Sequence, residues 1–165
     1  MIDAVADTND GFVRLSAAVP LHSDPDRVAA LIAEGAEAWD GEPADGAPSG
    51  LRRYGIDLRL RVGGERSGLT TFRKAAYVDI GAPRRRGDLW IAEIGWRATT
   101  AAPLFPVFSG RLLIGPDDLR IEGLYAPPGG IVGRVADRML LHVAANGTAH
   151  WLLSELDRAA LGAAG

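Results

Sequence analysis

The sequence predicts an α+β fold in which a curved antiparallel sheet is closed by one long C-terminal helix. Three observations support this fold class. Several segments alternate apolar and polar side chains, as strands with one buried face do. Most turns between these segments are short, which favours antiparallel pairing. Residues 131–161 instead follow an unbroken helical pattern, so the element order is strand, helices, strands and a long helix.

The N-terminal part is predicted to form one strand and two short helices. Residues 11–19 alternate as a half-buried strand does. Ser23 is the expected N-cap of the helix that follows, because Pro25 suits the first helical turn. Gly35 indicates a break into a second short helix, and the Gly, Pro and acidic residues of 40–50 predict a loop.

The strongest strand pattern lies at residues 53–62. Here Tyr54 and Ile56 alternate with Arg53 and Asp57, so we expect the first pair on a buried face and the second in solvent. Four further strands are predicted at residues 69–80, 88–99, 108–114 and 119–125.

The C-terminal helix follows a Pro- and Gly-rich hinge at residues 126–130, and we expect it to cover the sheet as a lid. The residues assigned to its buried side include Met139, Val143, Asn146, Gly147 and His150. Thr148 is expected to point away from that side. Beyond Gly147 the apolar stripe moves round the helix, which predicts a bend there, and the glycine itself suggests a close backbone approach.

Composition limits the possible classes of protein. The chain has 165 residues, 47% of them hydrophobic, which fits a single domain spanning residues 1–165 with a flexible segment at residues 1–10. The net charge is −3 without a basic face, so nucleic acid is not expected as a partner. The cluster at residues 84–86 is interpreted as a solvated turn, with an anion contact as the alternative.

The same features bear on location and redox chemistry. The chain has no Cys, which excludes disulfides and thiolate chemistry. It shows no secretory signal and no membrane span, so we expect a soluble, cytoplasmic protein. Its oligomeric state, monomer or homodimer, is left open.

The element order resembles the helix-grip superfamily. The resemblance covers nearly the whole chain and is carried by residues 125–133 (YAPPGGIVG), 136–138 (ADR) and 141–144 (LHVA). This superfamily, also called SRPBCC, includes START lipid-transfer domains, birch-pollen-allergen relatives and polyketide cyclase/dehydrase-like proteins. The resemblance implies a sheet of about seven strands gripping the last helix, with a cavity for an apolar ligand. Its motifs are structural and transfer no catalytic residue.

Lys74 is the only lysine among 18 basic residues. Strict alternation places it inward beside Phe72, where a buried amine could act as a base or bind a carbonyl or carboxylate. Alternatively, a bulge turns Lys74 outward, or its ammonium reaches the rim of the cavity.

His150 and Asn146 lie one helical turn apart and could present a donor and an acceptor to a ligand. The alternative is that both are core polar residues with partners inside the protein. His142 is expected at the surface or the rim.

The remaining candidate lining residues are large and apolar. They are Trp39, Tyr54, Phe72, Trp90, Trp96, Phe108, Tyr125, Met139 and Val143. Each can equally be ordinary core. A pocket is favoured because this fold does not readily fill its own interior.

No catalytic or cofactor motif is found in the sequence, and no metal site or cofactor is expected. The leading hypothesis is therefore a non-enzymatic protein that binds a small apolar or amphipathic molecule, such as a lipid, polyketide or isoprenoid-like compound, between sheet and last helix. One alternative is a cyclase, dehydratase or isomerase that acts in the same cavity. Another is a protein-interaction module with a filled interior.

Overall fold

The computed structural model describes residues 12–35, 41–62, 70–99, 107–126 and 135–163. Its elements in chain order are β1 (Val13–Pro20), α1 (Pro25–Glu34), β2 (Glu42–Ala44), β3 (Leu51–Val62), β4 (Thr70–Gly81), β5 (Arg84–Arg86), β6 (Leu89–Ala98), β7 (Val107–Ile114), β8 (Asp118–Ala126) and α2 (Val135–Gly162). The predicted α+β class is confirmed.

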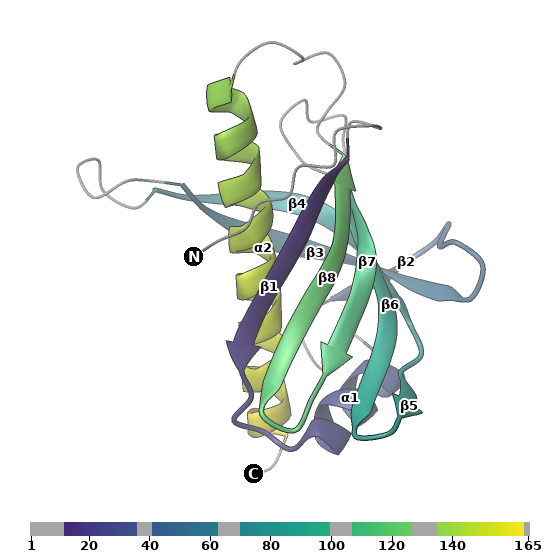
Figure 1. The fold of residues 1–165 in the computed structure, drawn as a ribbon. Coiled ribbons are helices and arrows are strands. Elements are labelled where there is room, and N and C mark those ends of the chain that lie inside the picture. The colour runs from purple at the N-terminus through teal and green to yellow at the C-terminus, as the bar shows by residue number, and fades with distance from the viewer. Residues whose placement is uncertain (1–11, 36–40, 63–69, 100–106, 127–134, 164–165) are drawn as a thin grey trace.

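The strands form one antiparallel sheet (Figure 1). Its order is β1-β8-β7-β6-β4-β3-β2, and β5 pairs with β6 outside this path. The sheet has 8 strands, one more than the resemblance implies, because β5, a strand of 3 residues, adds to the path of seven. Residues 84–86 are exposed, as expected, but they form β5 and not a turn.

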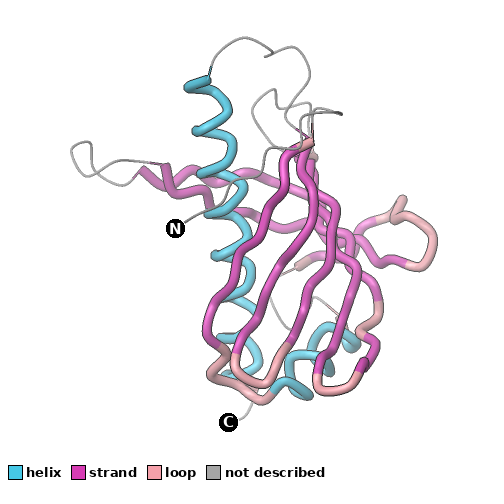
Figure 2. Tube along the Cα trace, in the orientation of Figure 1, coloured by secondary structure: helices cyan, strands magenta, loops and turns pink. Residues whose placement is uncertain are grey.

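One long helix covers one face of this sheet, called here the inner face. α2 contacts β1 at one edge of the sheet and β3 near the other, so the sheet curves around it (Figure 1). α1 packs against α2 at the end where the C-terminus lies (Figure 2). The opposite, outer face carries no helix among the described residues.

The strands follow the predicted alternation where side chains are described. In β1, Leu15 and Ala17 are buried, whereas Arg14 and Ser16, which alternate with them along the strand, are exposed. Tyr54 of β3 is buried on the inner face, also as predicted. The period of two residues therefore identifies the face that α2 covers.

The start of α1 differs from the prediction. Its N-cap is Asp24, whose side chain accepts a 2.8 Å hydrogen bond from the N–H of Asp26. Ser23 instead donates to the carboxylate of Asp157 in α2. Because the hydroxyl of Ser23 is bonded to Asp157, it does not cap α1, and the neighbouring Asp24 caps the helix instead.

Only one helix, α1, lies between β1 and β2 in the described part of the chain. α1 ends at Glu34, before Gly35 with φ 121°, and the second short helix would fall in residues 36–40, outside the described residues. The guanidinium of Arg52 donates to the carbonyls of Ile32 and Ala33 and so satisfies the last turn of α1.

α2 is a single helix of 28 residues. Its buried residues recur at helical spacing at Ala145, Thr148, Ala149, Leu152, Leu153, Leu156, Asp157 and Ala160. The predicted outward position of Thr148 is therefore wrong. Because strands from both ends of the sheet and α1 contact α2, a wider stripe is buried than a single flat sheet would cover.

The expectation of a close approach at Gly147 is also wrong. A Cβ built on Gly147 meets no atom within 4 Å, so this glycine is not required for packing. The predicted hinge at residues 127–130 lies outside the described residues. In the described part of the chain, no helix is both long and apolar enough to cross a membrane.

Candidate functional site

A row of large side chains crosses the inner face at right angles to the strands. Backbone pairing brings into one line Tyr54, Val78, Trp96, Phe108, Tyr125 and Val13. We call these residues the aromatic row. They come from six strands, β3, β4, β6, β7, β8 and β1, so strand register alone assembles the row.

Within this row Trp96 and Phe108 stack, with ring centroids 4.0 Å apart and planes at 21°. Such pairs contribute about 0.5–1.5 kcal/mol beyond the area they bury. Space for the Phe108 ring comes from the neighbouring row, where Gly110 pairs with Gly123. A Cβ on Gly110 would lie 2.6 Å from the Phe108 ring, and one on Gly123 would lie 2.8 Å from it.

The row is tightly packed. Tyr54 is 5% exposed, and Trp96, Phe108 and Tyr125 are each 2% exposed or less. Of the two possibilities that the sequence leaves open for these residues, core or cavity lining, their burial favours core. A molecule bound at this level would have to move side chains.

Two buried side-chain atoms of the described residues nevertheless have no hydrogen-bond partner. They are Nε1 of Trp96, from the sheet, and Oγ1 of Thr148, from α2, and neither forms a hydrogen bond within the protein. An unpaired buried donor costs about 1–3 kcal/mol. Such atoms call for an explanation, since most buried polar side-chain atoms in proteins are paired.

Tyr125 brings another polar group close to α2. Its hydroxyl oxygen lies 3.4 Å from Nδ1 of His142 on α2, and the two rings are 6.2 Å apart. Burial raises the pKa of Tyr125 above its ordinary value of 10.0, which favours the neutral phenol. His142 is exposed, as the sequence predicts. The pair therefore links the row to the surface.

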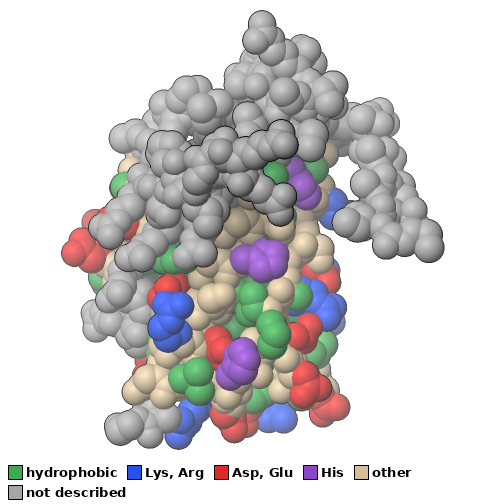
Figure 3. Space-filling model, turned by 90° about the vertical axis from the view of Figure 1, so that its left-hand side faces the viewer, with side chains coloured by type: hydrophobic (Ala, Val, Ile, Leu, Met, Phe, Trp, Pro, Cys, Tyr) green, Lys and Arg blue, Asp and Glu red, His purple; other side chains and the backbone are tan. Residues whose placement is uncertain are grey.

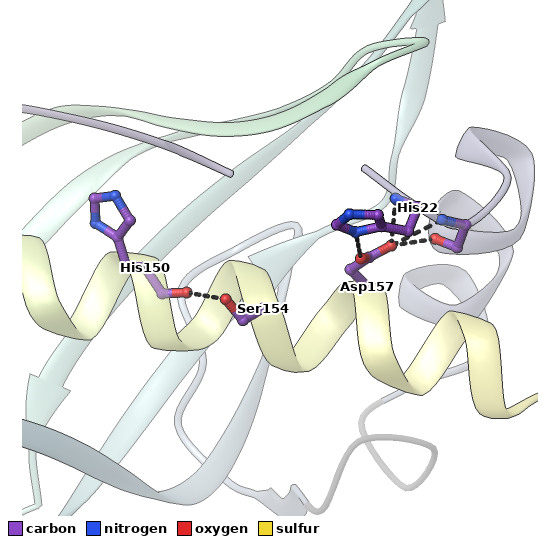
Figure 4. Close-up of polar contacts among 5 residues, drawn as sticks. His22, His150, Ser154 and Asp157 are labelled. Atoms are coloured by element: carbon purple, nitrogen blue, oxygen red, sulfur yellow. Dashed lines mark hydrogen bonds and ion pairs between the residues drawn. The ribbon is translucent and has the colours of Figure 1, made fainter. Parts of the chain in front are cut away.

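The other candidates on α2 face solvent more than expected. His150 is exposed, and its Nδ1 donates to the backbone carbonyl of Asn146 at 2.9 Å. Its own carbonyl accepts from Ser154 (Figure 4). Val143 is 49% exposed and Asn146 is half-buried. The predicted inward position of His150 and Val143 is therefore wrong, because the buried stripe runs through Ala145 and Ala149 instead.

Histidine side chains are visible on the face of the molecule drawn in Figure 3. His22 contacts the buried carboxylate of Asp157 on α2 (Figure 4). This contact was not predicted, since nothing in the local sequence pairs residues from opposite ends of the chain.

Trp90 belongs to a different corner of the molecule. It is half-buried beside α1, and its Nε1 donates to Oδ1 of Asp26 at 2.7 Å. The guanidinium of Arg85 lies 5.7 Å from its ring centroid, within reach of a cation–π contact. Trp90 therefore joins β5 and β6 to α1 and is not part of the aromatic row.

Four predicted residues fall outside the described part of the structure. Trp39 lies in residues 36–40. The backbones of Lys74 and Phe72 pair with Leu58 and Leu60, but their side chains, like that of Met139, are outside the described part. The orientation of Lys74 stays a prediction.

The outer face has a groove of about 530 Å³. Its lining includes Leu51, Asp79, Gly95, Arg97 and Arg111. It is open, and its exposed lining side chains lie on the side of the sheet away from α2. Trp96 and Phe108 of the aromatic row also border it.

Beside the groove lies an ion pair that the sequence did not predict. Arg53 donates to both oxygens of Asp79, at 2.7 and 2.9 Å, and both residues are 8% exposed. The expected solvent position of Arg53 is wrong because the loop before β3 folds over it. A Cβ on Gly46 would lie 3.3 Å from its Nη1.

Among the described residues, no group of three or more His, Asp or Glu side chains could hold a metal ion. Comparison of the chain with protein-family models, with curated proteins and with solved structures finds no match. Any functional conclusion therefore depends on the geometry of the structure itself.

Proposed function

We propose that this protein binds a small apolar or amphipathic molecule, such as a lipid, polyketide or isoprenoid-like compound, between the inner face of the sheet and α2. The observation that carries the proposal is the pair of unpartnered buried atoms, Nε1 of Trp96 and Oγ1 of Thr148. Trp96 lies on β6 of the sheet, and Thr148 lies on α2, which covers the inner face of that sheet through contacts with β1, β3 and β8. A ligand between these elements would supply the missing partners.

The element order supports the same proposal. A strand, a helix, a run of antiparallel strands and a long C-terminal helix packed on the sheet match the arrangement expected of a helix-grip protein. Assignment to that superfamily is part of the proposal. Its members include carriers that hold apolar ligands at the equivalent interface, which fits a predominantly apolar inner face.

Binding must overcome the packing of the aromatic row. Separating Trp96 from Phe108 would lose about 0.5–1.5 kcal/mol of stacking. A ligand that buries apolar area gains roughly 25 cal/mol per Å², so a contact of modest area offsets this loss. The ligand is therefore expected to enter with a rearrangement of side chains, and the slow step of binding should be that rearrangement.

The proposal is tested with the neutral dye Nile red and the full-length protein. We expect saturable fluorescence enhancement, and native mass spectrometry of freshly purified protein should show a retained small molecule. Trp96→Phe should weaken dye binding more than Trp90→Phe, because Trp90 already has a partner in Asp26. Absence of both saturable binding and a retained molecule would overturn the proposal.

A second candidate function is acid–base catalysis in the same interface. It is favoured by one observation, the approach of the buried Tyr125 hydroxyl to Nδ1 of His142. A neutral phenol can donate a proton to a carbonyl oxygen while an imidazole accepts one, as cyclisation, dehydration and isomerisation require.

This second function has its own test. With linear polyketone substrates, Tyr125→Phe should lower turnover by about 10²–10⁴-fold, the usual contribution of a positioned acid or base, without changing Nile red affinity. His142→Gln should lower turnover as well. If bound polyketones are recovered unchanged from the parent protein, the carrier function stands and the enzymatic one does not.

A further inference from the structure

The groove on the outer face has the size and the lining of a small-molecule site. Its volume of about 530 Å³ lies within the range of roughly 300–1,000 Å³ that is usual for ligand pockets. Pro48 and Leu51 line it at and before β3, and Val107, which is 51% exposed, lines it from β7. Gly95 of β6 lies between these strands and has no side chain, so a bound molecule can contact the main chain there.

Each described carboxylate that lines this groove has an arginine beside it. Asp79 accepts hydrogen bonds from Arg53 through both of its oxygens. Glu93 is directly opposite Arg111 in the pairing of β6 with β7, and directly opposed side chains on one face are within reach of each other. Arg97 also lines the groove, 4.0 Å from Asp79 and 46% exposed. Three arginines therefore accompany two carboxylates here, on a chain with a net charge of −3.

We infer that the groove of the outer face is a second binding site, which takes a small organic anion with an apolar body, such as an aromatic carboxylate. Arg97 binds the anionic group, because a guanidinium offers a planar fork of donors that matches a carboxylate. The apolar body covers Gly95 between Leu51 and Val107. This site is independent of the proposed function, which concerns the inner face.

The experiment compares naphthylacetate with naphthylacetamide, the neutral amide of the same acid. Each is titrated into the full-length protein at neutral pH in a calorimeter, and Nile red is titrated separately to report on the inner face. Naphthylacetate should bind about tenfold more tightly than the amide, as one charge-assisted hydrogen bond at a partly exposed site would produce. Added salt should weaken binding of naphthylacetate and leave that of the amide unchanged.

Variants assign this preference to Arg97. Arg97→Gln should abolish it, whereas Arg97→Lys should retain part of it, because the charge remains without the planar fork. Arg120→Gln is the matched control. Arg120 is on the same outer face, in β8, and is 44% exposed, but it is not among the residues that line the groove. Its replacement should leave the affinity for naphthylacetate unchanged.

Glu93→Gln gives a result that misfolding cannot imitate. The carboxylate of Glu93 lines the groove and repels an anion bound there. Its removal should therefore tighten binding of naphthylacetate by about threefold, the size of an exposed charge interaction, without changing the affinity for the amide. Weaker binding of naphthylacetate to Glu93→Gln would contradict the inferred position of the anion.

The remaining outcomes separate this site from the proposed function. If neither naphthyl compound binds, or if both bind equally, the inference is overturned. If Arg97→Gln and Arg120→Gln weaken naphthylacetate equally, the surface as a whole attracts the anion and the groove is not its site. If Nile red fails to bind while the preference for naphthylacetate holds and depends on Arg97, the second site stands and the inner-face function loses its support.

Discussion

Asp157, in the last third of α2, accepts hydrogen bonds from both the backbone N–H and the hydroxyl of Ser23, at 2.9 and 2.8 Å, across 134 positions of sequence. The backbone N–H and the Nδ1 of His22 donate to the same carboxylate, at 3.1 and 2.9 Å. Four donors from the segment between β1 and α1 therefore converge on one side chain of the last helix. This contact fixes α2 against the start of the chain.

Asp157→Asn should destabilise the protein. The substitution removes the charge that strengthens four hydrogen bonds and places an amide N–H₂ against donors, so we expect a loss of about 1.5–3 kcal/mol in the free energy of unfolding. Urea titration measures it. Glu155→Gln is the control on the same helix, since its ion pair with Arg158 is at the surface and should change stability by less than about 0.5 kcal/mol. If Asp157→Asn and Glu155→Gln lowered the free energy of unfolding by equally small amounts, the hydrogen bonds to Asp157 would not be what holds α2 in place.

The contribution of Asp157 should depend on pH in one direction. Burial by itself raises the pKa of this carboxyl, but hydrogen bonds from His22 and Ser23 outweigh it and hold the pKa below its ordinary value of 3.8. The unfolded state therefore binds the proton more readily, so the stabilisation is complete above the unfolded pKa and is lost as pH falls through the lower folded pKa. The difference in stability between the parent and Asp157→Asn should be constant near neutral pH and shrink only below about pH 4. A difference that shrinks as pH rises would contradict this assignment.

Local sequence patterns were sufficient to predict the six long strands, but they missed the two strands of 3 residues each, β2 in a predicted loop and β5 in a predicted turn. Tyr54 and Leu15 lie on the inner face because side chains alternate along a strand, and that rule needs no knowledge of the partner. The same alternation failed for Arg53, which is on the predicted outer face but is covered by the preceding loop and paired with Asp79. Whether a loop covers a side chain depends on where the loop folds, and the alternation of apolar and polar residues along a strand carries no information about that.

The candidate site was harder to predict for a related reason. Trp96, Phe108 and Tyr125 were identified as large inward residues, but their assembly into one row follows from strand register, which no segment specifies alone. The sequence predicts the wrong side of α2 for Thr148, because a helical wheel assumes a single apolar face. The sheet and α1 cover more of that helix than one face.

Gly110→Ala should be strongly destabilising. Its added Cβ would lie 2.2 Å from the carbonyl oxygen of Glu122 and 2.6 Å from the Phe108 ring, and the backbone atom cannot move without breaking the pairing of β7 with β8. We expect a loss of about 3 kcal/mol, the upper end of overpacking effects, measured by urea unfolding. Gly55→Ala in β3 is the control, because its Cβ would meet its nearest atom at 3.8 Å. A similar loss of stability in both variants would show that replacing any strand glycine has this effect, and that the contact of Gly110 with the Phe108 ring is not its cause.

Arg53→Met should also destabilise the protein, through the partner that it leaves behind. Asp79 would then be a buried carboxylate that keeps, among the described residues, only the more distant guanidinium of Arg97, with Nη2 4.0 Å from Oδ2. Breaking a buried pair in this way costs about 3–5 kcal/mol. Adding Asp79→Leu to Arg53→Met should recover much of the loss, because no unpaired charge remains. If the double variant is less stable than Arg53→Met alone, the pair is not coupled as the geometry indicates.

Thr148→Val should stabilise the protein without ligand. The hydroxyl of Thr148 is fully buried and has no partner within the chain, so a methyl group of nearly the same shape removes an unpaired polar group and leaves the packing intact. We expect a gain of about 1 kcal/mol in the free energy of unfolding, although most core substitutions lower it. Thr99→Val is the matched control, because the hydroxyl of Thr99 donates to the carbonyl of Ala75 at 3.3 Å and its removal should give no gain. A loss of stability in Thr148→Val would show that its hydroxyl has a partner in the free protein, such as a buried water, and that a ligand need not supply one.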